Sequence, residues 1–179
     1  MIRGDYTRYL YMYKAMGYKV FMKYKDEILY YSKRFDIDPE IIFFLITNEQ
    51  MNRGNCTTKL IEFFIATFLP SFAIKKDLSI GLGQIKISTA KNVFQKNILP
   101  KQLINPEFNI YCVTYLVKNM GIFKTKTLDV VPEIVKAYIL GENNKKLCTR
   151  EQKLYVELCK WSYKYSYFNR LRRTIKVSC

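Results

Sequence analysis

The sequence predicts a mainly α-helical protein that forms one domain over residues 1–179. Apolar residues make up 49% of the chain, enough to build a core, and they recur at helical spacing through most of its length. Sustained alternation of apolar and polar residues, the pattern of a half-buried strand, is missing outside the C-terminal tail. Two segments also begin with the same helix-start signal, a capping side chain followed by proline and glutamate: Asp38-Pro39-Glu40 and Asn105-Pro106-Glu107.

The first part of the chain is expected to hold three helical stretches. Residues 7–35 carry apolar faces that predict one or two helices, with an interruption at Gly17. The helix that begins after Asp38 is apolar on every side, so it is expected to lie inside the domain and to end near Arg53. Residues 57–69 form a second apolar helical stretch, which the following proline stops.

The rest of the chain predicts one short irregular element and four helices. Residues 79–87 hold two glycines in three positions, which indicates a loop or a short extended segment. A helix is expected over about 88–97, and another runs from the second helix-start signal to a glycine stop, over 105–121. A proline opens a helix over 132–141, and a capping box opens a basic one over 149–175.

The charge of the chain predicts attraction to polyanions. Lysine and arginine number 30 against 15 acidic residues, a net charge of +15. Such a protein is expected to associate with nucleic acid, acidic lipid surfaces or anionic cell-wall polymers. The alternative is a solvated lysine surface without a specific partner.

Several classes of site are disfavoured by composition. There is no histidine, so a Ser–His or Cys–His nucleophile is excluded, and a zinc site would need unusual ligands. The five cysteines are scattered and odd in number, as expected of reduced thiols, and neither a metal nor a cofactor is expected. The first twenty residues lack the apolar core of a signal peptide, and the longest apolar stretches are too short to span a bilayer. We therefore expect a soluble protein made in the cytoplasm.

Glu49 is the strongest candidate for chemistry. It lies three residues beyond the unbroken apolar run 41–46, toward the negative end of the predicted helix. Partial burial and the helix dipole both disfavour the carboxylate and raise its pKa, as a general acid near neutral pH requires. The alternative is a glutamate that simply reaches water at the end of its helix.

Four segments in order resemble those of the lytic transglycosylases and the wider goose-type-lysozyme-like superfamily. They read "RFDIDPEIIFFLITNEQMNRG", "DLSIGLGQIKISTA", "LINPEFNIYCVTYLVKNM" and "KAYILG", and together they cover about residues 30–141. The resemblance implies a lysozyme-like helical domain with a small loop or short β element around SIGLGQ. Its core would span about 25–145, with an N-terminal helical segment 1–25 and the basic C-terminal helix 149–175.

The resemblance also implies roles for particular residues. Glu49 takes the place of the single catalytic acid/base, and Gln50, which stands where the family usually has serine, is expected among the substrate-binding residues, as is Tyr138. Ser79, Gly81 and Gln84 match the substrate-binding loop, in which the glutamine hydrogen-bonds the glycan or braces the loop. Small residues there would suit a sugar chain pressed against the backbone.

The fourth motif and the acid before the loop each allow two interpretations. Tyr138 matches a tyrosine whose hydroxyl approaches the catalytic carboxyl, although helical spacing also fits a core aromatic. Asp77 stands before the loop and is the candidate second acid, or it shapes the turn. The longer interval before the loop, residues 55–76, would line or cover the cleft or meet a partner, and its single acid, Glu62, receives no role.

The implied activity is cleavage of the β-1,4 bond between N-acetylmuramic acid and N-acetylglucosamine in peptidoglycan, with a 1,6-anhydro product. The enzyme would reach the cell wall by a route that needs no standard signal peptide, and it would bind glycan strands and anionic wall polymers. Two alternatives remain. One is a hydrolytic lysozyme that uses Asp77 as its second acid. The other is a non-catalytic basic module that binds the wall, or binds nucleic acid through the basic and aromatic residues of 160–176.

Overall fold

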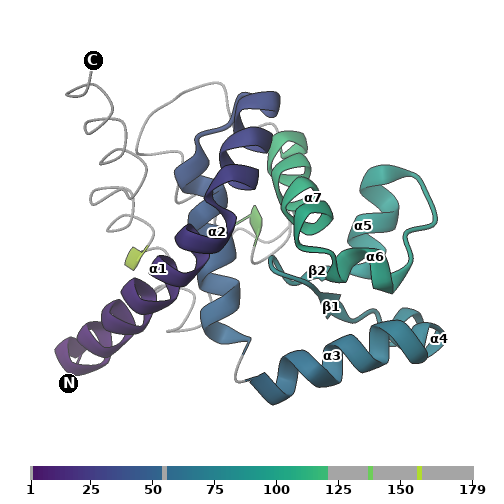
Figure 1. Cartoon of the computed structure of the whole chain (residues 1–179), viewed down its shortest axis with the longest axis horizontal. Coiled ribbons are helices and arrows are strands. Elements are labelled where there is room, and N and C mark those ends of the chain that lie inside the picture. The colour runs from purple at the N-terminus through teal and green to yellow at the C-terminus, as the bar shows by residue number, and fades with distance from the viewer. Residues whose placement is uncertain (1, 54–55, 121–136, 139–156, 159–179) are drawn as a thin grey trace.

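The structure, a computed structural model, describes residues 2–53, 56–120, 137–138 and 157–158, and it is mainly helical as predicted (Figure 1). The described elements, in chain order, are α1 (Ile2–Phe35), α2 (Pro39–Asn52), α3 (Cys56–Phe68), α4 (Pro70–Lys75), β1 (Ser79–Ile80), β2 (Ile85–Lys86), α5 (Ile87–Phe94), α6 (Pro100–Ile104) and α7 (Pro106–Asn119). None of the described helices is long and apolar enough to cross a membrane.

α1 is one uninterrupted helix of 34 residues, so the expected break at Gly17 is wrong. Gly17 is buried within the helix, and the buried side chains of Tyr13 and Val20 lie on either side of it. The Tyr13 ring lies 5.7 Å from that of Phe44 on α2. A mid-helix glycine costs only about 1 kcal/mol relative to alanine, and packing of the flanking turns against α2 outweighs that cost.

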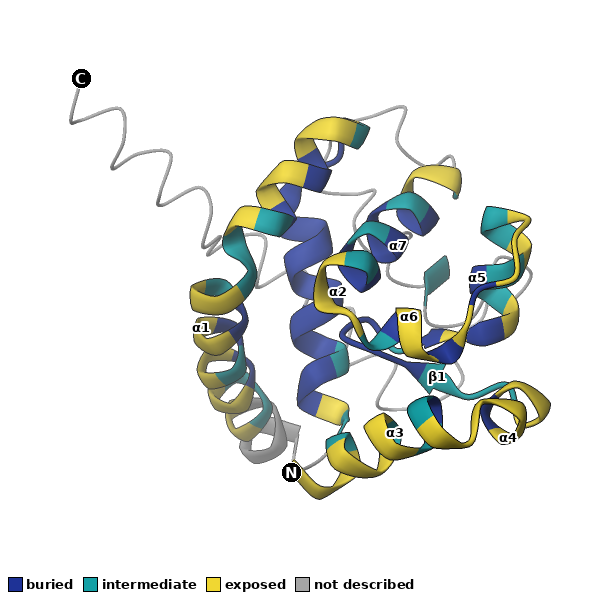
Figure 2. Ribbon diagram, turned by 45° about the vertical axis from the view of Figure 1, so that its right-hand side comes forward, coloured by how far each residue is buried: buried dark blue, intermediate teal, exposed yellow. Residues whose placement is uncertain are grey.

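α2 is the central helix and confirms the helix-start signal. The Asp38 carboxylate accepts a hydrogen bond from the Glu40 amide at 3.0 Å, and Pro39 occupies the first helical position. α1 and α7 pack against α2, and Figure 2 shows α2 buried along almost its whole length. This is the position expected of a helix that is apolar on every side.

α3 and α4 leave this core and run along one side of the molecule, where α6 packs against both helices (Figure 1). The proline at 70 stops α3 as predicted, but it also opens the short helix α4. α4 was not predicted, because its six residues are too few to show a helical period.

The segment 79–87 forms a small antiparallel hairpin, which confirms the expected loop or short extended element. Ser79 pairs with Lys86, and Ile80 pairs with Ile85. α5 then ends at Phe94, three residues before the expected end, because Gln95 adopts a left-handed backbone with φ of 49°. α6 was not predicted either.

α7 begins as predicted, with the Asn105 side chain accepting from the Phe108 amide at 2.9 Å. Its buried face packs toward α1, α2 and the hairpin. The helices predicted over 132–141 and 149–175 lie outside the described residues, apart from 137–138 and 157–158, which are helical.

Candidate functional site

The Glu49 carboxyl lies in the last turn of α2 and is only partly exposed to solvent. Burial raises its pKa from an ordinary value of 4.5 to about 7. The direction and the main cause are those that the sequence predicted. Near neutral pH this carboxyl is therefore divided between its protonated and ionised forms, so it is able both to donate and to accept a proton.

The next residue ties this end of α2 to the hairpin. Gln50 is buried, and its amide nitrogen donates to the Leu82 carbonyl oxygen at 2.8 Å. A serine at this position, as in the resembled family, would be too short to make the same contact. The longer side chain therefore holds the turn of the hairpin against the helix that carries Glu49.

Asn109 of α7 fastens the hairpin from the other side. Its oxygen accepts from the Gly83 amide at 2.7 Å, and its nitrogen donates to the carbonyl oxygens of Ile80 at 3.0 Å and Leu103 at 2.8 Å. The side chain is fully buried and its polar atoms are hydrogen-bonded. Asn109, a residue of the third motif, thus ties the hairpin to α7.

Glu62 of α3 makes contacts that were not predicted from the sequence. Its carboxylate accepts from the Gly81 amide at 2.8 Å and from the Gln84 side chain at 3.1 Å. Arg53, the C-cap of α2, pairs with both of its oxygens, one of them from Nε at 2.8 Å. One carboxylate therefore links the end of α2, the helix α3 and the hairpin.

A signal for this role was present in the sequence. Glu62 is the single acid in the apolar stretch 55–76, and a charge among apolar residues must either reach water or find a partner. The sequence did not show which partner, because Arg53 and Gly81 lie 9 and 19 residues away along the chain.

The two glycines of the hairpin are required by packing within the protein. Gly81 has φ of +87°, and a Cβ there would lie 2.0 Å from the Asn109 side-chain nitrogen. A Cβ on Gly83 would lie 2.2 Å from a methyl carbon of Val113. Packing against α7 therefore accounts for both glycines, and their contact with a sugar chain stays a prediction.

Gln84 braces the hairpin, one of the two roles considered for it. Besides its contact with Glu62, its side-chain nitrogen donates to the Gly81 carbonyl oxygen at 2.9 Å. Its backbone is left-handed, with φ of 48°. The residue therefore completes the turn that its own side chain stabilises.

Tyr138 reaches the same hairpin from the far end of the described chain. Its hydroxyl donates to the Gly83 carbonyl oxygen at 2.7 Å. Burial, and then the charges of Glu49 and Cys112, raise the pKa of the phenol well above its ordinary value. Tyr138 is thus within electrostatic range of Glu49, and it also makes a structural hydrogen bond.

Asp77 and Ser79 have positions that do not single them out for catalysis. The two Asp77 oxygens accept from the backbone amide and the hydroxyl of Ser88, each at 2.7 Å. The aspartate therefore caps the beginning of α5, which is the turn-shaping alternative considered for it. Ser79 belongs to β1 and is partly buried.

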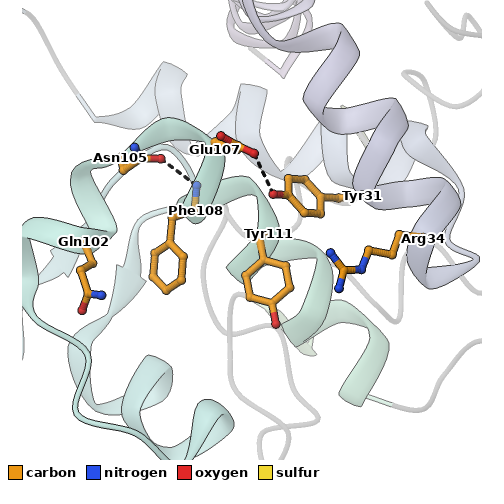
Figure 3. Close-up of a pocket in the computed structure, with 7 residues that line it drawn as sticks. All are labelled: Tyr31, Arg34, Gln102, Asn105, Glu107, Phe108 and Tyr111. Carbon is orange, nitrogen blue, oxygen red and sulfur yellow. Dashed lines mark hydrogen bonds between the residues drawn. The ribbon is translucent and has the colours of Figure 1, made fainter.

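A pocket of about 490 Å³ lies between α1, α6 and α7 and contains none of these candidate residues (Figure 3). In it the Tyr31 hydroxyl donates to the Glu107 carboxylate at 3.1 Å. Burial and this carboxylate raise the pKa of Tyr31 to about 12. The pocket is thus a separate feature, and four of its lining residues belong to the third motif: Asn105, Glu107, Phe108 and Tyr111.

Among the residues that the structure describes, no cluster of histidine, cysteine and acidic side chains could hold a metal ion. Cys56 and Cys112 are free thiols. Comparisons with protein-family models, curated proteins and solved structures gave no match for this chain.

Proposed function

We propose that this protein is a peptidoglycan-cleaving muramidase of the lytic transglycosylase type, with a lysozyme-like helical domain and Glu49 as its acid/base. The observation that carries the proposal is the partly buried Glu49 carboxyl, with a pKa of about 7, at the end of a buried helix beside a fastened glycine-rich hairpin. A carboxyl in such surroundings costs stability when it ionises, and a chemical role explains why it is kept there.

The chemistry needs one carboxyl group in two states. Protonated Glu49 gives its proton to the glycosidic oxygen as the bond from C1 of N-acetylmuramic acid to that oxygen breaks. The resulting carboxylate takes the proton of the muramoyl C6 hydroxyl, whose oxygen forms a new bond to C1. The 1,6-anhydro ring closes, the carboxyl is protonated again, and no water is consumed. A pKa near 7 suits both steps.

The hydrogen bonds that Asp77 and Glu62 already make favour this reaction over hydrolysis. An inverting hydrolase needs a second carboxylate to activate water, and a retaining one needs it as a nucleophile. Both Asp77 oxygens accept hydrogen bonds from Ser88, and Glu62 is held by Arg53 and the hairpin. Using either acid in catalysis would cost these contacts.

The net charge of +15 suits the proposed substrate and surroundings. Anionic wall polymers would raise the local concentration of a basic enzyme near its glycan strands. Neither a metal nor a cofactor enters the proposed reaction.

Digestion of purified sacculi tests the proposal, with mass spectrometry of the released muropeptides. Wild-type protein should release 1,6-anhydro products, and Glu49→Gln should abolish release while the protein stays folded. Glu27→Gln, a charge-matched change on α1, is the control and should leave the rate unchanged. Products with reducing ends would indicate the hydrolase. Absence of release from any sacculus, or equal release by Glu49→Gln, would contradict the proposal, and tight DNA binding in its place would favour the nucleic-acid module.

A further inference from the structure

α3 and α4 lie along the lower edge of Figure 2, and most of their residues are exposed on this side of the molecule. Eight large side chains on this side are between 37% and 67% exposed: Leu60, Ile61, Phe63, Phe64, Phe68, Leu69, Phe72 and Ile74. We name these eight residues the α3–α4 face. The small residues Ala66 and Ala73 are the only buried ones of the two helices.

This arrangement reverses the pattern of an ordinary surface helix. Such a helix buries its large apolar side chains and exposes polar ones. Single exposed apolar residues are common, but eight large ones within residues 60–74 are typical of a site of interaction. The large residues of the α3–α4 face therefore require an occupant in the working protein.

The charges around the face are cationic. Lys59 lies at its N-terminal end, and Lys75 and Lys76 lie at its C-terminal end. Burial lowers the pKa of Lys59, and the nearby charges of Arg53, Lys23 and Lys19 lower it further, although Cys56 acts in the opposite direction. Lysines of α1 thus add to the positive charge at the first end.

The acids of this region offset only part of that charge. Glu62 is the only acid within residues 56–76, and it is bound to Arg53, Gly81 and Gln84. Asp77, the next acid, is bound to Ser88 at the start of α5. The face therefore combines large apolar side chains with lysines at both ends.

We propose that the α3–α4 face docks onto an anionic lipid surface. Phenylalanine, leucine and isoleucine side chains enter the boundary between headgroups and acyl chains, and lysines bind the acidic headgroups. The proposal concerns a helix pair lying in the interface, and it does not depend on the proposed muramidase activity.

Two other occupants fit the observations less well. A second copy of the chain would bring two faces together and place cationic ends near cationic ends, which disfavours association. The residues that contribute most to binding at protein interfaces are most often tryptophan, tyrosine and arginine. Residues 56–76 contain none of these three, although the chain has 15 tyrosines.

Vesicle flotation of the full chain tests the proposal. The probes are phosphatidylcholine vesicles with and without phosphatidylglycerol, each at low and at high salt. Wild-type protein should float with the anionic vesicles and stay bound at high salt. Phe64→Ser/Phe68→Ser should weaken salt-resistant binding by about 100-fold, because the variant loses two rings that enter the lipid. Lys59→Gln/Lys75→Gln/Lys76→Gln should remove the preference for anionic lipid.

Matched controls separate insertion from charge and from misfolding. Tyr11→Ser/Tyr18→Ser removes two rings that are 75% and 61% exposed on α1, and it should not change binding. Thermal unfolding of Phe64→Ser/Phe68→Ser should match that of wild type, because the rings are exposed. Sacculi contain no lipid, so muropeptide release should be the same in every variant, and failure of one proposal leaves the other intact.

Three outcomes would overturn the lipid proposal. The first is binding that salt abolishes equally in wild type and Phe64→Ser/Phe68→Ser, which would show attraction by charge alone. The second is a wild-type dimer in light scattering that this variant converts to monomer, which would assign the face to a second copy. The third is a monomer that does not float with anionic vesicles at all.

Discussion

α2 and α3 are two apolar helices of nearly equal length with opposite surroundings. Twelve of the 14 residues of α2 are buried, whereas Ala66 is the only buried residue among the 13 of α3. Each contains a Phe-Phe pair, Phe43-Phe44 in one and Phe63-Phe64 in the other. Apolar composition therefore does not by itself bury a helix: α2, which is apolar on every side, is buried, and α3, which is also rich in apolar residues, is not.

The difference comes from what lies on either side of each helix. α2 has α1 along one side and α7 along another, so its own large apolar side chains are covered on both sides. α3 has α4 and α6 as its main neighbours and attaches to the hairpin through Glu62. We infer that α2 holds the fold by apolar burial, whereas α3 is fixed to it by a polar contact and keeps its apolar side for a partner.

Paired truncations give the largest expected contrast. Phe44→Ala opens a cavity beside Tyr13 and should lower the free energy of unfolding by about 3–5 kcal/mol. Phe64→Ala removes an exposed ring and should change the free energy of unfolding by no more than about 0.5 kcal/mol. Denaturant titration of both variants measures the contrast, and equal losses would show that α3 is also part of the core.

Weakening the polar contact that attaches α3 should lower the free energy of unfolding by less than Phe44→Ala does. Glu62→Gln keeps the shape of the side chain but removes its charge, which weakens its bonds to Arg53 and to the Gly81 amide. We expect a loss of about 2 kcal/mol in the free energy of unfolding.

Arg53→Gln and the double variant complete a double-mutant cycle. The cycle should give a favourable coupling free energy between the Arg53 and Glu62 side chains, measured by the same denaturant titrations. Additive losses would show that the ion pair does not hold α3 to the end of α2.

Removing the hydrogen bond from α2 to the hairpin should give the smallest loss in the free energy of unfolding. Gln50→Leu leaves the buried Leu82 carbonyl oxygen without the amide donor that lies 2.8 Å away. We expect a loss of about 1 kcal/mol, with faster hydrogen exchange at the amides of the hairpin. If exchange there is unchanged, Gln50 does not fasten the hairpin.

Elements set by local chemistry could be predicted from the sequence. The caps at Asp38 and Asn105 act on amides two or three residues away, so the beginnings of α2 and α7 were found correctly. The glycines of 79–87 likewise marked the hairpin. The continuity of α1 through Gly17 was not predicted, because it depends on packing against a helix that follows later in the chain.

In the candidate site, too, features set by local sequence could be predicted and those set by distant contacts could not. Burial of Glu49 followed from its place at the end of an apolar helix. The role of Glu62 did not, because its contacts join residues from 9 to 22 positions apart in sequence. The interpretation of the glycines was incomplete for a similar reason, since only the fold shows that Asn109 and Val113 lie against them.

The central claim is that Glu49 sits in partly dry surroundings that keep its carboxyl protonated close to neutral pH. Its pKa in the folded protein should lie near 7, against 4.5 when solvated. The contribution of the protonated Glu49 carboxyl to the free energy of unfolding should therefore be fully present below about pH 4.5 and be lost as pH rises through 7. The loss amounts to roughly 3 kcal/mol and should be missing in Glu49→Gln.

Carbon-13 NMR of the side-chain carboxyl carbons measures this directly, with Glu49→Gln used to assign the resonance. We predict that the Glu49 signal titrates with a midpoint near 7. A midpoint close to 4.5 would show a solvated carboxylate and contradict the account.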